Sequence, residues 1–283
     1  MKKWILTIAV LFAGLTALAQ GTINTRSYRL SDFTDKVTQV VLTGNEVLSG
    51  ALSQEVVAQW TASAFEFCTL EQFEKLKTDD RYYFLMAAES RFKGEENPGI
   101  TFLTLVKGGP EASEGIGSMF EVVSFPLMAA MGGNGRELIF LGALVKAVQE
   151  FALAAMESEK VAYGAEGWIN QRYDQEGRMM QIFIPEEDLS PAVKEKDLEK
   201  YLDDDFHIVD TAEEADQYYL DGAYNTLVGY TVAPVLPEKA SYCYKMLFEA
   251  HSGSLYHISR HKYTPKKGVG FLPQDLRQLS HKR

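Results

Sequence analysis

One order of predicted strands and helices occurs twice along this chain, and it constrains the fold more than any other feature of the sequence. Patterns of apolar residues predict the first occurrence as strand 37–43, helix 47–60, strand 65–68, helix 70–76, strand 82–88 and a hairpin of 100–107 and 119–127. They predict the second as strand 179–184, helix 192–202, strand 206–209, helix 212–220, strand 225–233 and a hairpin of 241–249 and 255–263. The sequence therefore predicts a mixed α/β (α+β) protein with two tandem β-α-β-α-β-β-β units.

The two units correspond most clearly at their second strand. Phe65–Thr69 aligns with Phe206–Asp210, which lies 141 residues later, and the alternate inward positions of both strands are apolar. Each segment ends on a residue type that caps helices, Thr69 or Asp210, and an acidic helix follows. Element order and spacing, rather than residue identity, predict a tandem duplication. The alternative is one domain with a single mixed sheet, whose halves look alike because β-α-β order is common.

A strongly apolar segment separates the two units. In residues 137–158 apolar side chains almost encircle the predicted helix, which is typical of a buried helix. Lys146, Gln149 and Glu150 interrupt them, so the helix is predicted to lie in the core or at the seam between the units rather than in a membrane. The Gly-rich, polar interval 161–177 is predicted to be a linker, which divides the mature chain into units 20–160 and 178–283.

The N-terminal residues have the pattern of a secretory signal peptide. Two lysines precede an apolar run from Trp4, and Ala17-Leu18-Ala19 is a small-residue cleavage site, so residues 1–19 are predicted to be removed. The run is shorter than the roughly 20 residues that cross a bilayer, and no transmembrane segment is expected in the mature chain. No cysteine follows the cleavage site to carry a lipid. We therefore expect an exported protein, located in the periplasm, at the outer membrane or outside the cell.

Net charge argues against one class of partner. The chain carries a formal net charge of -11, which would repel a polyanion, so nucleic acid is not expected to bind. Basic residues nevertheless collect at the C-terminal end, where residues 260–283 contain one acid, Asp275, among several Lys and Arg. This basic tail could contact an anionic envelope surface, or it could be a solvated end that folds back on the acidic body of the protein, because charged termini are usually solvated.

Two groups of residues could carry redox or metal chemistry. Cys68 and Cys243 would meet an oxidising compartment after export, so a disulfide is permitted, although cysteines in strands are often just small buried residues.

His257 and His261 share one face of a predicted strand with Ser259 between them. A third metal ligand is missing, so we expect solvated histidines and no metal site. No cofactor motif occurs, and no cofactor is expected.

The remaining polar motifs favour turns. Residues 132–135 are Gly-rich and precede the long helix, where backbone amides could hold a phosphate. The segment lacks the Lys and Ser or Thr of a Walker loop, which favours a simple turn. The acidic runs 186–188 and 203–205 flank strands and are predicted to be solvated turns rather than paired catalytic carboxylates.

Aromatic and loop residues supply the candidate binding sites. Trp168, with Tyr163 and Tyr173 in the predicted linker, could stack on sugar rings or pin the two units together. For a protein partner, the candidate contacts lie in the loop 108–117 and in the turn of the second hairpin: Gly108, Glu111, Glu114 and His251.

Each unit also resembles domains of known envelope proteins. The strand, helix, strand, helix and meander, carried by the Phe65 and Phe206 strands with their following helices, resembles the small periplasmic α/β domains of curli-secretion lipoproteins and of Tol-system propeller proteins. The whole chain resembles an uncharacterised secreted family of Gram-negative envelope proteins. These resemblances imply a location in the envelope and supply no catalytic residues.

The expected function is that of an exported, non-enzymatic envelope protein that binds a protein partner or an envelope polymer. The alternative is a hydrolase or small-ligand-binding protein whose site lies in a cleft between the units, around Trp168 and His207. A self-assembling structural surface protein is the third interpretation.

Overall fold

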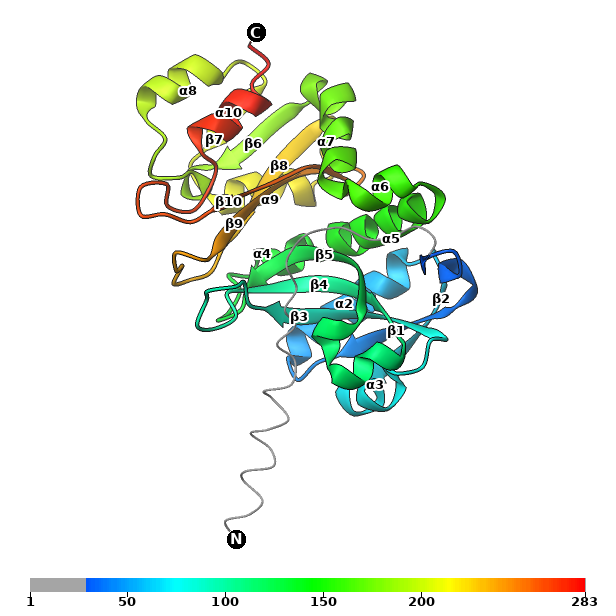
Figure 1. The fold of residues 1–283 in the computed structure, drawn as a ribbon. Coiled ribbons are helices and arrows are strands. Elements are labelled where there is room, and N and C mark those ends of the chain that lie inside the picture. The colour runs from blue at the N-terminus through cyan, green and yellow to red at the C-terminus, as the bar shows by residue number, and fades with distance from the viewer. Residues whose placement is uncertain (1–28, 283) are drawn as a thin grey trace.

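The computed structural model describes residues 29–282, so the predicted signal peptide, residues 1–19, lies outside the described residues. The described chain forms two five-stranded sheets, each flanked by helices (Figure 1). The mixed α+β class with two β/α units is confirmed. The alternative of a single mixed sheet is wrong, because the strands of the first half and those of the second half form separate sheets.

The first sheet has the strand order β2-β1-β3-β4-β5. Its strands and the helices between them are β1 (Val37–Leu42), α2 (Glu46–Gln59), β2 (Ala64–Thr69), α3 (Leu70–Leu76), β3 (Tyr82–Ser90), β4 (Ile100–Lys107) and β5 (Phe120–Ala129). β1 lies between two parallel neighbours, β2 and β3, and β3, β4 and β5 form an antiparallel meander. A short 3-10 helix, η3 (Phe33–Asp35), precedes β1.

The second sheet has the equivalent strand order, β7-β6-β8-β9-β10. Its elements are β6 (Gln181–Pro185), η7 (Glu186–Asp188), α8 (Glu195–Tyr201), β7 (Phe206–Val209), α9 (Ala212–Leu220), β8 (Thr226–Val232), β9 (Tyr242–Glu249), β10 (Leu255–Lys262) and α10 (Pro273–Leu279). β6 is parallel to both β7 and β8, and β8, β9 and β10 form the meander. The two units therefore share one topology, while their descent from a duplication stays a prediction.

Side-chain caps fix where the crossover helices begin. At α3 the Thr69 hydroxyl accepts from the Gln72 amide at 3.2 Å, and the Gln72 side chain accepts from the Thr69 amide at 2.8 Å. At α9 the cap is Thr211, whose hydroxyl accepts from the Glu214 amide at 3.2 Å. The predicted cap, Asp210, is wrong by one residue, because its own amide donates to the Glu214 carboxylate instead.

The long apolar helix lies between the two sheets and joins their cores (Figure 1). It is divided at Phe140 into α4 (Arg136–Ile139) and α5 (Leu141–Glu157), rather than continuous over 137–158 as predicted. Phe140 is fully buried and stacks on Tyr230 of β8 and Phe248 of β9, with ring centroids 4.8 and 5.2 Å apart. No described helix is long and apolar enough to cross a membrane. The helix is buried at the seam instead.

The interval 161–177 is helical rather than an irregular linker. It contains most of α6 (Glu159–Tyr163), all of α7 (Ala165–Gln175) and the start of η6 (Gly177–Met179). Ala162, Ala165 and Ile169 are buried in the shared core, and α7 packs along β10. The composition of the interval is nevertheless polar and Gly-rich, because only Ala162 of α6 and Ala165, Ile169 and Tyr173 of α7 are buried.

The segment 108–117 is folded rather than a free loop. The 3-10 helices η4 (Pro110–Glu114) and η5 (Ile116–Ser118) place Ala112 and Ile116 in a small core beside α3. Gly108 is buried, and a Cβ there would lie 2.2 Å from the carbonyl oxygen of Asp79. Gly108 is therefore a glycine because two backbone segments approach closely, and its buried position gives no support to the prediction that it contacts a partner.

The basic C-terminal segment folds back on the second unit. α10 packs against α8, and the Lys282 ammonium donates to the carbonyl of Glu199 at 3.3 Å. His281 Nδ1 lies 3.3 Å from Asp203 Oδ1. Up to residue 282 the tail thus folds back as expected, but it is not a solvated end, because Asp275, Leu276 and Leu279 are buried.

Candidate functional site

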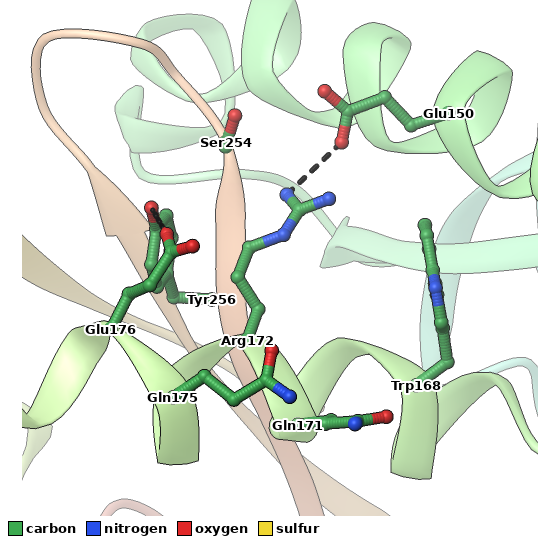
Figure 2. Close-up of a pocket in the computed structure, with 8 residues that line it drawn as sticks. All are labelled: Glu150, Trp168, Gln171, Arg172, Gln175, Glu176, Ser254 and Tyr256. Atoms are coloured by element: carbon green, nitrogen blue, oxygen red, sulfur yellow. Dashed lines mark hydrogen bonds and ion pairs between the residues drawn. The ribbon is translucent and has the colours of Figure 1, made fainter.

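A polar cleft opens at the seam between the units, where α5, α7 and the start of β10 meet (Figure 2). Its volume is about 320 Å³, at the lower end of the roughly 300–1,000 Å³ typical of small-molecule pockets. The cleft is lined by Glu150, Trp168, Gln171, Arg172, Gln175, Glu176, Ser254 and Tyr256. Because most of these side chains are polar, the cleft suits a ligand that forms hydrogen bonds.

Arg172 occupies the centre of the cleft wall. Its guanidinium donates to Glu150 Oε2 at 3.1 Å and to the Leu255 carbonyl at 3.4 Å. The same group lies over the rings of Trp168 and Tyr256, 5.5 and 5.7 Å from their centroids, and Figure 2 shows it between them. A guanidinium held by a carboxylate, a carbonyl and two rings is fixed in position. The wall of the cleft is therefore preformed.

Tyr256 and Glu176 form a second polar pair in the cleft. The Tyr256 hydroxyl donates to Glu176 Oε2 at 3.0 Å. Burial, together with the Glu176 carboxylate, raises the pKa of the Tyr256 phenol to about 12, so the phenol is a neutral donor at physiological pH. The exposed amides of Gln171 and Gln175 add both donors and acceptors.

Trp168 gives the cleft its aromatic surface. Its ring packs edge-on against buried Phe151 of α5, with centroids 6.2 Å apart. This contact and the neighbouring Arg172 hold the indole half-buried in the wall. An aromatic face beside amides and carboxylates suits a sugar, because the apolar face of a sugar ring stacks on the indole while its hydroxyls bind the polar groups.

The three predicted ligand-binding residues lie in different surroundings. Trp168 lines the cleft. Tyr173 is only 3% exposed, and its hydroxyl donates to the carbonyl of Leu279, so it holds α10 in place instead. Tyr163 is exposed on α6 and is not part of the lining. Tyr163 and Tyr173 therefore do not join Trp168 in one site.

The predicted partner contacts are divided between the two units. Glu111 and Glu114 are exposed on η4 of the first unit. His251 is exposed in the β9–β10 turn of the second unit and stacks on Tyr224, with ring centroids 3.7 Å apart. His207, which the hydrolase alternative places near Trp168, stacks on Phe183 of the neighbouring strand and does not line the cleft.

Sequence reasoning missed most of the cleft. Trp168, Gln171, Arg172 and Gln175 follow the spacing i, i+3, i+4 and i+7, which places them on one face of α7. The polar, Gly-rich composition of 161–177, which favours a linker, hides this signal. A second signal was Glu150, an acid that interrupts an otherwise apolar helix and now lies at the mouth of the cleft.

Arg136 links the two units through buried charges. Its Nε and Nη2 donate to the two carboxylate oxygens of Asp216 on α9, at 2.8 and 2.7 Å. Its Nη1 donates to Asp188 Oδ2 at 2.9 Å, and Nη2 also donates to the Gly229 carbonyl at 2.8 Å. Asp188 is 7% exposed. The prediction that 186–188 is a solvated turn is therefore wrong at Asp188, because a buried arginine binds it.

A second buried cluster lies under α10. His257, Ser259 and His261 share one face of β10, as predicted, and Lys245 of β9 lies opposite Ser259. Lys245 Nζ donates to Asp275 Oδ2 of α10 at 2.8 Å and lies 3.2 Å from His261 Nδ1. The expectation of solvated histidines is wrong because α10 covers this face. Residues 29–282 hold no group of His, Cys, Asp and Glu arranged to bind a metal.

His257 makes the fold sensitive to acid. Its ring is buried against Tyr173, and its Nε2 has no hydrogen-bond partner among the described residues. Burial lowers the pKa of His257 from 6.5 to about 4. The folded state binds the proton less tightly than the unfolded state. Protonation of His257 therefore costs no stability above pH 6.5, and it lowers the free energy of unfolding increasingly as the pH falls toward 4.

We therefore expect the stability difference between wild type and His257→Leu to depend on pH. Relative to the variant, the wild type should lose up to about 1.4 kcal/mol per pH unit in this window, as one proton is taken up on unfolding. Urea unfolding at a series of pH values measures the two slopes. His251→Leu, which replaces an exposed histidine, should keep the wild-type slope. Parallel slopes for wild type and His257→Leu would contradict the prediction.

The other motifs have structural roles. In the turn 132–135, the Gly135 amide donates to Glu137 Oε2 at 2.9 Å, and the Arg136 amide donates to Asn134 Oδ1 at 3.2 Å. The chain's own side chains thus accept from amides that a phosphate would need.

Cys68 and Cys243 are buried, lie in different sheets and are not joined in a disulfide.

A scan against protein-family models, a search of curated proteins and a search of solved structures found no match. The fold and the cleft define a two-unit mixed α/β protein with a preformed polar cleft at the seam of its units. What this cleft can bind follows from its side chains: the indole of Trp168, two carboxylates, a fixed guanidinium, two amides and the hydroxyls of Ser254 and Tyr256.

Proposed function

We propose that this is an exported, non-enzymatic envelope protein that binds a neutral, hydroxyl-rich polymer, such as an envelope glycan, in the cleft between α5, α7 and β10. The observation that carries the proposal is the Trp168 ring set in a wall of hydrogen-bonding groups. Export is supported by the signal-peptide pattern of residues 1–19.

The charges of the cleft favour a neutral ligand over an anionic one. Glu150 and Glu176 contribute two carboxylates, while the one guanidinium, on Arg172, is already held by Glu150. An anionic polymer would meet this acidic wall and a body with a net charge of -11. Sugar hydroxyls can instead donate to the carboxylates and accept from the glutamine amides.

The two carboxylates also make a hydrolase the second candidate function. Glycoside hydrolysis uses a pair of carboxyl groups, one of which must act as an acid and is typically kept protonated by apolar surroundings. Glu176 is exposed and accepts from Tyr256, and Glu150 is held by Arg172. Neither glutamate has the apolar surroundings that such an acid requires, so binding is favoured over hydrolysis.

Removal of the aromatic face is expected to weaken binding. Trp168→Ala should raise the dissociation constant for a neutral oligosaccharide at least ~10-fold, because the stacking surface is lost. Binding is measured on an array of neutral, acidic and amino-sugar oligosaccharides, followed by calorimetric titration of the strongest binder. Tyr163→Ala is the matched control, since it removes an exposed aromatic residue outside the cleft and should leave the affinity unchanged.

Two results would count against this proposal. If no oligosaccharide binds, or if Trp168→Ala and Tyr163→Ala lose equal affinity, the cleft is not a glycan site. If the protein releases shorter sugars and Glu150→Gln or Glu176→Gln abolishes the release, the hydrolase is the correct function.

A further inference from the structure

Within residues 29–282 the two sheets have four edges, and three of them are covered or shortened. At β10, the Asn170 side chain of α7 accepts from the Ile258 amide at 2.8 Å and donates to its carbonyl at 3.0 Å. β5 contains Pro126, and its Leu127 carbonyl accepts from the Tyr230 hydroxyl at 2.6 Å. β7 has only four residues. Proteins use such features to stop sheet edges from pairing with other chains.

The fourth edge, β2, has none of these features among the described residues. It is a six-residue strand at the edge of the first sheet opposite β5. Its register with β1 is continuous, and it contains no proline. Phe65 and Phe67 point to one face with their rings 5.7 Å apart, and Phe67 is 39% exposed. An extended segment beside β2 would therefore find both open backbone groups and an apolar surface.

Glu66 determines which segment fits this edge. Its carboxylate accepts from Gln39 on β1 at 2.7 Å, a neutral partner, and it forms no ion pair with a described residue. Opposite charges in cross-strand positions attract and like charges repel. A second copy of this chain, paired antiparallel about Glu66, would place two glutamates side by side. A basic residue opposite Glu66 is favoured instead.

We propose that β2 is a docking edge for an extended protein segment in which apolar residues alternate with Lys or Arg. The segment adds a strand to the first sheet, its backbone pairs with β2, its apolar residues cover Phe65 and Phe67, and a basic residue pairs with Glu66. This surface is separate from the cleft, so the docking proposal does not depend on glycan binding.

The test uses three capped peptides as probes: one alternating valine with lysine, one alternating valine with glutamate, and the lysine peptide with alternate backbone nitrogens methylated. The lysine peptide is expected to bind the purified protein and to slow hydrogen exchange of the amides in residues 64–69. Backbone methylation should weaken binding at least ~10-fold, because the pairing groups are lost. Glu66→Lys should shift the preference toward the glutamate peptide by roughly 3-fold. Glu213→Lys, an exposed change on α9, should leave the preference unchanged.

Several results would overturn the proposal. Equal binding of the methylated peptide would show that backbone pairing is not involved. Protection of amides elsewhere, or a preference that Glu66→Lys does not alter, would place the docking surface away from β2. If the protein alone forms a dimer in which residues 64–69 are already protected, a second copy occupies the edge and the proposal is wrong.

Discussion

Replacing Arg136 with alanine is expected to lower the free energy of unfolding by about 3–5 kcal/mol. The loss comes from the two carboxylates that remain, Asp188 and Asp216, which are 7% and 4% exposed and would keep no cationic partner. Burial raises the pKa of Asp188 to about 6 even though Arg136 opposes this shift. Without the guanidinium, both acids must either stay ionised in the interior or bind a proton, and the Gly229 carbonyl also loses a donor.

Chemical unfolding monitored by circular dichroism measures this effect. Arg136→Lys keeps the charge but cannot form the forked contact with both oxygens of Asp216, so it should fall between wild type and alanine. Arg81→Ala is the surface control, because the Arg81 side chain that pairs with Asp79 is 74% exposed and its loss should hardly move the unfolding midpoint. If Arg136→Ala behaves like Arg81→Ala, the buried link does not stabilise the protein.

Replacing Lys245 with methionine is expected to have an effect of similar size, about 3–5 kcal/mol. Lys245 is fully buried, and it is the cation that faces Asp275, whose carboxylate also accepts from the Leu272 amide at the start of α10. Methionine fills a similar volume but leaves Asp275 buried and unpaired. We therefore expect α10 to detach before the sheets unfold, which hydrogen exchange of residues 273–279 would report.

A double substitution separates the loss of the ion pair from the loss of packing. Lys245→Met combined with Asp275→Asn removes both charges and keeps the shape, so its cost should be clearly less than the sum of the two single changes. Additive effects would mean that the ammonium and the carboxylate do not interact. Lys267→Met, an exposed lysine in the loop before α10, serves as the control for removal of a positive charge.

The order of strands and helices along each unit could be predicted because most strands and crossover helices have a clear apolar period, whereas the order of the strands within each sheet was not predicted. The strand at Phe65 and the strand at Phe206 were placed within a residue or two, and Thr69 was identified as a cap. Local patterns of this kind depend only on neighbouring residues. The resemblance to envelope domains and the export of the chain stay predictions.

The cleft and the buried charges could not be predicted because they join residues that are distant in sequence. Arg136 and Asp216 are 80 positions apart, and nothing near either residue indicates the other. Asp188 sits in an acidic run that looks solvated by composition, and its burial depends on the arginine. α7 was missed for a different reason: Gly164 precedes it, Gly167 lies in its first turn, and only Ala165, Ile169 and Tyr173 of this helix are buried.

The stacking of Phe140 between the units also affects how the chain must fold. Its ring partners, Tyr230 and Phe248, follow 90 and 108 positions later in the chain. A nascent chain that has emerged only through α5 cannot yet cover this side of the helix, so an apolar surface stays open until β8 and β9 have been synthesised. Closure of such a distant contact is slow relative to local structure, so the unfinished chain keeps an apolar surface exposed to aggregation until the second sheet forms.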